Sequence, residues 1–101
     1  MDPEIPDIFI ADVVTTTSGR DAGQFFYVIK EESSFLYLAN GKDRTLDKPK
    51  RKKRKHVQKV LRSETRVAEK LRLGDKVLNS ELRRDLAFVC QDMQSHNPGG
   101  F

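Results

Sequence analysis

Residues 8 to 32 read IFIADVVTTTSGRDAGQFFYVIKEE, and this stretch decides the fold. Its first part, residues 8–18, is rich in β-branched and aromatic side chains, which fit a pleated, half-buried surface better than a helix. The GRDAG loop at 19–23 is bounded by glycines that accept positive φ, and the apolar run QFFYVIKEE at 24–32 follows it. The whole stretch therefore predicts a β-hairpin.

Three more strands are expected after this hairpin. FLYLA at 35–39 is the third, and the Asn40-Gly41 pair behind it favours a two-residue type I′ turn into a fourth strand at 44–46. HVQKVL at 56–61 is the fifth strand. Because residues 25–29 are apolar on both alternating sets, the second strand needs cover on each face, which is typical of a small, tightly curved barrel.

The periodicity changes from that of a strand to that of a helix after residue 62. Ser63 is placed to cap a first helix, and Gly74 suits its C-terminal end. A second helix opens at Asn79 or Ser80, and its apolar residues recur at three- and four-residue steps. These residues are Leu82, Leu86, Val89, Cys90 and Met93. We expect both helices to fold back against the β-strands.

The predicted organisation is a flexible acidic extension at 1–7, a β-barrel at 8–61, a helical appendage packed on it at 62–93, and a flexible tail at 94–101. A chain of 101 residues buries only a modest core, so we expect no deep substrate cavity. The fold class is mainly β.

Positive charge is concentrated in one part of the chain. The net charge is +4, yet residues 42–62 hold eleven Lys and Arg against Asp43 and Asp47, which gives this segment +9 and leaves −5 on the rest. Six consecutive cations, Lys50 to Lys55, form the basic run. Such segregation directs a polyanion to one side of the molecule, so it favours a docking face for phosphate over a uniformly adhesive surface.

The sequence lacks the residues that several classes of function need. Cys90 is the single cysteine, so no intramolecular disulfide can form, and we expect it to pack in the second helix rather than to act as a nucleophile. His96 and the carboxylates show no metal-ligand spacing, and no phosphate-cradling glycine loop is present. We therefore expect no catalysis, cofactor, small-molecule substrate or metal. The acidic start and the lack of a long apolar stretch favour a cytoplasmic protein that does not bind membranes.

The hairpin stretch TSGRDAGQFFYVI, residues 17–29, resembles a KOW motif, in which a turn with a basic residue and a glycine joins two strands; Gly23 matches the motif glycine. The segments ANGKDRTLDKPKRKKRKH at 39–56 and LRLGDKVLNSELRRDL at 71–86 are similar to a family of bacterial KOW-domain RNA-binding proteins. That family in turn resembles the archaeal and eukaryotic large-subunit ribosomal protein of the "L fourteen e" type. The resemblance spans roughly residues 8–90.

This resemblance implies an SH3-like five-stranded barrel, no catalysis, and RNA as the partner, with ribosomal RNA the expected class and ribosomal proteins as possible neighbours. Arg20 in the GRDAG loop is then expected on a phosphate or a base edge, with Ser18 and Gln24 donating hydrogen bonds beside it. The glycines of this loop are explained by hairpin geometry alone.

We interpret the basic run as one edge of the RNA-binding face. A run tethered between two strands loses less entropy on binding than a free tail, although a solvated charge block or a nuclear address has the same composition. The predicted RNA-binding residues are Ser18, Arg20, Gln24, Lys42, Arg44, Lys48, Lys50, Arg51, Lys52, Lys53, Arg54, Lys55, His56 and Lys59.

Aromatic side chains could stack on unpaired bases. The candidates all fall within strands, so we expect most of them in the core, with Tyr27 or Tyr37 in an outward position. They are Phe25, Phe26, Tyr27, Phe35 and Tyr37.

Two alternative functions stay open. The first is a protein-interaction adaptor of the transcription or translation machinery, in which the stripe from Leu82 to Met93 is exposed. The second is an accessory protein for duplex DNA, since cations meet phosphate in either nucleic acid.

Overall fold

The computed structural model describes residues 7–17, 19 and 23–95, with side chains up to residue 91. Five antiparallel strands form one sheet in the order β4-β3-β2-β1-β5. The strands are β1 (Asp12–Thr16), β2 (Phe25–Glu31), β3 (Phe35–Ala39), β4 (Lys50–Lys53) and β5 (Val57–Arg62). A 3-10 turn, η1 (Arg54–His56), joins β4 to β5, and two helices follow, α1 (Arg66–Leu73) and α2 (Asn79–Ser95). The prediction of a mainly β chain with two C-terminal helices is confirmed.

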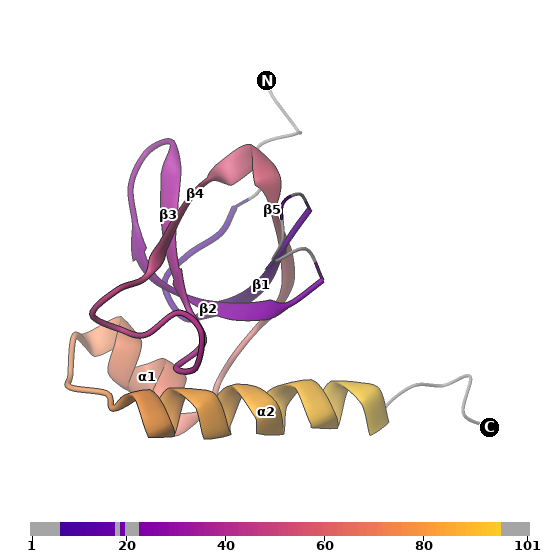
Figure 1. The fold of residues 1–101 in the computed structure, drawn as a ribbon. Coiled ribbons are helices and arrows are strands. Elements are labelled where there is room, and N and C mark those ends of the chain that lie inside the picture. The colour runs from indigo at the N-terminus through magenta and orange to yellow at the C-terminus, as the bar shows by residue number, and fades with distance from the viewer. Residues whose placement is uncertain (1–6, 18, 20–22, 96–101) are drawn as a thin grey trace.

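The sheet curls strongly, and the helices lie together at one end of it (Figure 1). The curl is helped by irregularities in two ladders, one between Val13 and Val14 of β1 and one between Val28 and Lys30 of β2. An extra residue on one strand bends that strand and increases its twist. The hydrogen-bonded order begins at β4 and ends at β5, so the ladder stays open between these two edges, which η1 connects covalently.

Both faces of β2 are buried, as its apolar run predicts. Phe26 and Val28 lie in a cluster on the inner face of the curled sheet, and Tyr27 between them lies in a second cluster on the outer face. The inner cluster consists of Ile8, Val14, Phe26, Val28, Leu36, Leu38 and Val57. Side chains alternate between the two faces of a strand, so a strand that is apolar throughout is buried only when a core covers each face.

The outer core is formed by the helices. Leu82, Leu86 and Val89 of α2 are buried with Tyr27 and Ala39 of the sheet. Cys90 packs against the same cluster, as predicted, and burial raises the pKa of its thiol. The side chain of Met93 lies outside the described residues. The adaptor alternative requires this stripe to be exposed, and its described members are instead core residues.

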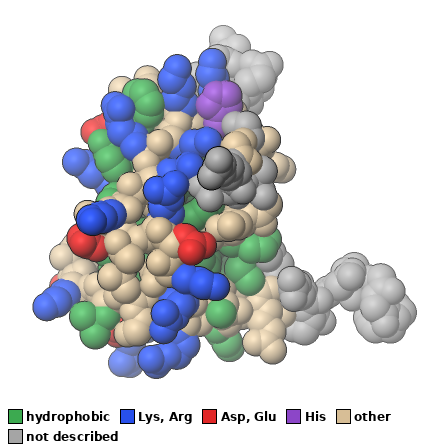
Figure 2. All heavy atoms as spheres, viewed as in Figure 1, with side chains coloured by type: hydrophobic (Ala, Val, Ile, Leu, Met, Phe, Trp, Pro, Cys, Tyr) green, Lys and Arg blue, Asp and Glu red, His purple; other side chains and the backbone are tan. Residues whose placement is uncertain are grey.

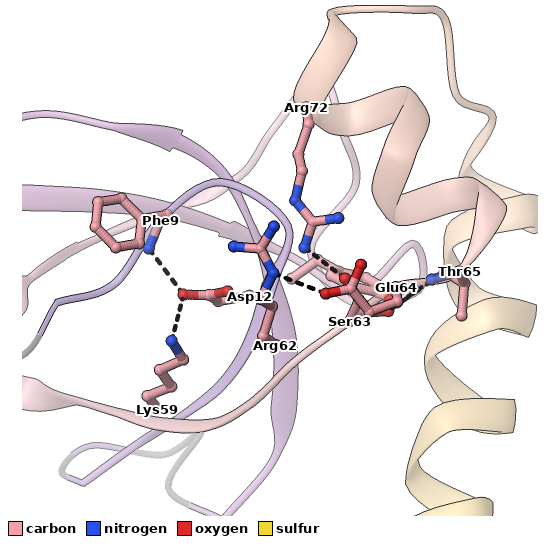
Figure 3. A network of polar contacts seen from close by, with 9 residues as sticks. Phe9, Asp12, Lys59, Arg62, Ser63, Glu64, Thr65 and Arg72 are labelled. Atoms are coloured by element: carbon pink, nitrogen blue, oxygen red, sulfur yellow. Dashed lines mark hydrogen bonds and ion pairs between the residues drawn. The ribbon is translucent and has the colours of Figure 1, made fainter.

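The linker between β5 and α1 is held by a network of polar side chains. Tyr27 Oη donates to Asp85 Oδ2 of α2, and Thr65 Oγ1 donates to the same carboxylate at 2.8 Å. Ser63 Oγ lies 2.9 Å from Tyr27 Oη. The Arg72 guanidinium donates to the carbonyl oxygen of Ser63 (Figure 3). Burial and the Asp85 carboxylate raise the pKa of the Tyr27 phenol, so it stays protonated, and able to donate, to a higher pH than an exposed tyrosine. The network ties the sheet to both helices.

The helix ends agree with the sequence except at one cap. The N-cap of α1 is Thr65, whose Oγ1 accepts a hydrogen bond from the backbone N–H of Ala68 at 3.2 Å. The prediction of Ser63 as the cap is wrong, because its hydroxyl is buried against Tyr27. Gly74 ends α1 with φ 77, as predicted, and α2 begins at Asn79.

The first strand is shorter than the predicted 8–18. A turn precedes it, in which Asp12 Oδ2 accepts from the backbone N–H of Phe9 at 2.9 Å and Ala11 has a φ of 74. This turn directs Ile8 into the inner core, where it is fully buried.

The predicted fourth strand at 44–46 is wrong, because residues 40–49 form a loop and the basic run itself supplies β4. Two backbone N–H groups of this loop, those of Lys42 and Arg44, donate hydrogen bonds to Asn40 Oδ1. The N–H of Leu46 donates to Asn79 Oδ1 at 2.8 Å. These amides are therefore used within the loop and at the start of α2, and they are not available to a sheet.

The Asn40-Gly41 pair does not form the predicted type I′ hairpin turn. That turn needs positive φ at both central residues, and among the described non-glycine residues only Ala11 has one. Gly41 has a φ of 77 and packs against α2, where a Cβ would come within 2.3 Å of the Asn79 carbonyl oxygen. The glycine is required for this close approach of the loop to the helix.

Candidate nucleic-acid interface

The basic run does not lie between two strands as predicted, since its first four residues are a strand of the sheet and its last two begin η1. Arg51 and Lys53 are exposed on β4, while Lys50 and Lys52 are half-buried. In the ladder with β3, Lys50 pairs with Leu38 and Lys52 pairs with Leu36, which belong to the inner core. Residues paired across a ladder share a face of the sheet, so Lys50 and Lys52 lie on the face of the inner core, where a lysine can pack its aliphatic stem on apolar side chains. The cations are thus held in a fixed register.

The curl of the sheet brings the first hairpin loop beside the basic run. A Cβ built on Gly19 would lie 3.4 Å from Lys52 Nζ. The backbone N–H of Thr17 donates to the His56 carbonyl oxygen at 3.0 Å, and Thr17 Oγ1 donates to the same oxygen at 3.2 Å. Ser18 and Arg20 lie outside the described residues. Two segments far apart in sequence therefore meet at one edge of the molecule.

The remaining predicted residues fall in two places. Lys55 is exposed and His56 half-buried in η1, next to β4. Lys42 and Lys48 are exposed and Arg44 half-buried in the 40–49 loop. Lys42 and Gln24 line a groove against α2, together with Phe25, Asn40, Asp43, Arg83, Leu86, Ala87 and Cys90. None of the basic-run residues lines this groove, so the predicted set does not form a single cluster.

Arg54 is oriented toward the protein itself. Its Nε donates to the Glu32 carbonyl oxygen at 3.1 Å and its Nη1 to the Ile8 carbonyl oxygen at 3.2 Å. Its Nη2 lies 3.6 Å from Glu31 Oε1, and only 17% of the side chain is exposed. The guanidinium thereby joins the N-terminal segment to the turn between β2 and β3, which favours a structural role over contact with a ligand.

Lys59 also faces an internal partner. Its Nζ lies 3.3 Å from Oδ2 of Asp12, a carboxylate that is almost fully buried and that also accepts from the N–H of Phe9 (Figure 3). A buried carboxylate without a counter-charge is costly, so this lysine neutralises Asp12. Arg54 and Lys59 therefore both have a role in the fold.

Figure 2 shows Lys and Arg side chains across one face of the molecule, with several gathered at the top of the view, over η1. Acidic side chains appear among the basic ones lower on this face. Like charges gathered at one edge create a local positive potential, which attracts phosphate.

Two contacts between cations and aromatic rings lie beside β4, and sequence reasoning missed them. The guanidinium carbon of Arg51 is 3.6 Å from the centre of the Phe35 ring, and Lys30 Nζ is 5.2 Å from the centre of the Tyr37 ring. Phe35 and Tyr37 are half-buried, whereas Tyr27, the other candidate for an outward position, is fully buried. The spacing of Phe35 and Tyr37, two residues apart on one strand, could have indicated that both lie on one face.

The chain matches no protein-family model and no curated protein. Within the described part of the chain, no helix is long and apolar enough to cross a membrane. No group of three or more potential metal ligands occurs among the same residues.

Proposed function

We propose that this protein is a non-catalytic RNA-binding protein that contacts ribosomal RNA, or another structured RNA of the ribosome, through the basic edge formed by β4, η1 and the first hairpin loop. The observation that carries this proposal is the position of the basic run. Four of its six cations, Lys50 to Lys53, stand on a strand paired with β3, and Lys52 lies beside the hairpin loop. A rigid row of cations loses little conformational entropy when it meets a phosphate backbone.

An SH3-like barrel of the KOW type is part of the same proposal. Three features support it: the strong curl of the five strands, the two cores on opposite faces of β2, and the short η1 link between the edge strands. The hairpin between β1 and β2 is the segment that resembles the KOW motif.

The mechanism is electrostatic capture followed by docking that depends on RNA shape. Arg51, Lys53 and Lys55 are exposed and suited to phosphate, while Lys50 and Lys52 lie at the core's edge. With Arg54 and Lys59 paired within the fold, roughly four phosphates can be engaged, which corresponds to a log-log salt slope of about −3. Phosphate contacts orient the RNA without reading its sequence.

The test measures binding of a labelled ribosomal RNA hairpin by fluorescence anisotropy at several salt concentrations. A variant carrying Arg51→Gln, Lys52→Gln and Lys53→Gln is compared with a control carrying Arg66→Gln, Lys76→Gln and Arg84→Gln. The control removes the same charge from exposed positions in α1, α2 and the loop between them. We expect the β4 variant to lose at least tenfold in affinity and to flatten the salt slope by about 2 to 3, and the control to lose much less.

Equal losses in the two variants would mean that net charge alone is being measured and that the face is wrongly assigned. Competition with duplex DNA of the same length and charge tests the DNA alternative. We expect the RNA to be displaced poorly by the DNA, and equal displacement would favour the DNA-accessory function.

A further inference from the structure

The outer face of the sheet is divided into a covered end and an uncovered end. Phe35, Tyr37 and Ala39 alternate with the inner-core residues of β3, so all three share the outer face. Ala39 lies opposite Tyr27 and is buried under α2. Phe35 and Tyr37, farther from the helices, remain half-buried. Two aromatic rings are therefore left partly accessible next to the basic strand.

Cations on the neighbouring strands form rows with these rings. Tyr37 pairs with Lys30 of β2 on one side and with Arg51 of β4 on the other. Phe35 pairs with Lys53 of β4. The surface thus alternates between aromatic and cationic side chains across three strands.

Arg51 is held in place on this surface while much of it stays exposed. Its guanidinium lies over the Phe35 ring, and its Nε is 3.8 Å from Glu32 Oε1. The other oxygen of Glu32, Oε2, accepts from Tyr37 Oη at 3.3 Å. The Arg51 side chain is 53% exposed. A planar group that is supported on one side by a ring and open on the other is prepared to receive a second flat group.

We propose that Phe35, Tyr37, Arg51 and Lys30 form a stacking platform for an unpaired base of the bound RNA. This inference rests on the proposed function, because the phosphate-binding edge of β4 would bring the RNA to the platform. Arginine planes and aromatic faces both stack on bases, and sequence-specific recognition of RNA mostly targets unpaired bases. The platform would add a preference for unpaired nucleotides that the phosphate contacts cannot supply.

The test uses two RNA hairpins of equal length, one fully paired and one with a single-nucleotide bulge that carries 2-aminopurine. Arg51→Lys keeps the charge and removes the planar group, and Phe35→Leu keeps an apolar side chain and removes the ring below it. Arg66→Lys and Phe88→Leu make the same changes at exposed positions of α1 and α2. Thermal unfolding monitors whether Phe35→Leu remains folded, and the exposed Arg51→Lys tests the platform independently of packing.

We expect Arg51→Lys to weaken binding of the bulged hairpin about tenfold, to change binding of the paired hairpin less than about twofold, and to leave the salt slope unchanged. The 2-aminopurine fluorescence should be quenched by the wild type and less so by the variant. If Arg51→Lys and Phe35→Leu bind both hairpins like the wild type, the platform is wrong and RNA binding stands. If the wild type binds neither hairpin, the proposed function fails, and the platform with it.

Discussion

The two ends of the sheet use polar groups in opposite ways. At the end covered by the helices, Tyr27 and Thr65 both donate hydrogen bonds to Asp85, which joins three parts of the chain. At the edge formed by β4 and η1, Arg51 and Lys53 project into solvent. The first arrangement stabilises one packing of helices on sheet, and the second leaves charge available for a partner. Substitutions should therefore separate into those that change stability and those that change binding.

Arg51 and Arg54 repeat this contrast within the basic run itself. One guanidinium rests on a ring at the surface, and the other bonds to two backbone carbonyl oxygens and a carboxylate. The same residue type, three positions apart, is exposed at one position and hydrogen-bonded within the fold at the other. Charge in a sequence therefore does not identify a binding residue until its partners are known.

The largest effect is expected for Leu82→Ala in the outer core. Leu82 is fully buried, so the truncation leaves a cavity and should lower the free energy of unfolding by about 3 kcal/mol, measured by urea denaturation. Phe88→Ala on the exposed side of the same helix should cost less than about 1 kcal/mol. Below the unfolding transition, both variants should bind RNA like the wild type. Loss of RNA affinity in folded Leu82→Ala would contradict the claim that one end of the sheet serves stability and the other serves binding.

Arg54→Ala should come next, with a loss of about 2 kcal/mol in the free energy of unfolding, because the carbonyl oxygens of Ile8 and Glu32 lose their donor. Arg51→Ala, at an exposed position, should change stability by less than about 0.5 kcal/mol and should weaken RNA binding instead. Urea denaturation and anisotropy on the same two preparations give both numbers. If Arg51→Ala lowers stability and Arg54→Ala weakens only RNA binding, the roles of the two arginines are assigned the wrong way round.

Tyr27→Phe should have a smaller effect, of about 1 kcal/mol, because Asp85 and Ser63 each lose one partner. The pKa of Tyr27 is raised in the folded protein, so its stabilising contribution is complete below the ordinary tyrosine pKa of about 10 and is lost as the pH rises above that value. Unfolding measured between about pH 9 and 11 should therefore show a steeper decline for the wild type than for Tyr27→Phe. Tyr37→Phe serves as the control, and a decline equal to the wild type's in Tyr27→Phe would contradict the buried network.

The sequence predicted the strands and helices where local chemistry agrees with tertiary packing. The apolar run at 25–29 predicted two buried faces, and the stripe of α2 predicted its packing on the sheet. The prediction failed at Asn40-Gly41, because the Asn40 side chain and Asn79 of α2 take the amides that a hairpin would use. The basic run was not recognised as β4, since lysine and arginine have little strand preference and the pairing with β3 alone makes them a strand.

For the candidate site, the sequence predicts where positive charge is concentrated, but not which of these side chains bind partners within the fold and which stay exposed. The proximity of the first hairpin loop to Lys52 depends on which strands pair across the curved sheet, and the apolar run that predicts the curvature does not predict this pairing. The internal partners of Arg54 and Lys59 are 20 or more residues distant in sequence. The ring below Arg51 belongs to a strand that only the observed register brings beside it.

The most direct test of the basic edge is an amide NMR titration of the full chain with the ribosomal RNA hairpin, at moderate salt. We expect the largest shifts in β4, in η1 and in the hairpin loop between β1 and β2, with α1 and the exposed side of α2 changing little. Shifts concentrated on α2 around Arg84 and Phe88, with β4 unaffected, would contradict the account.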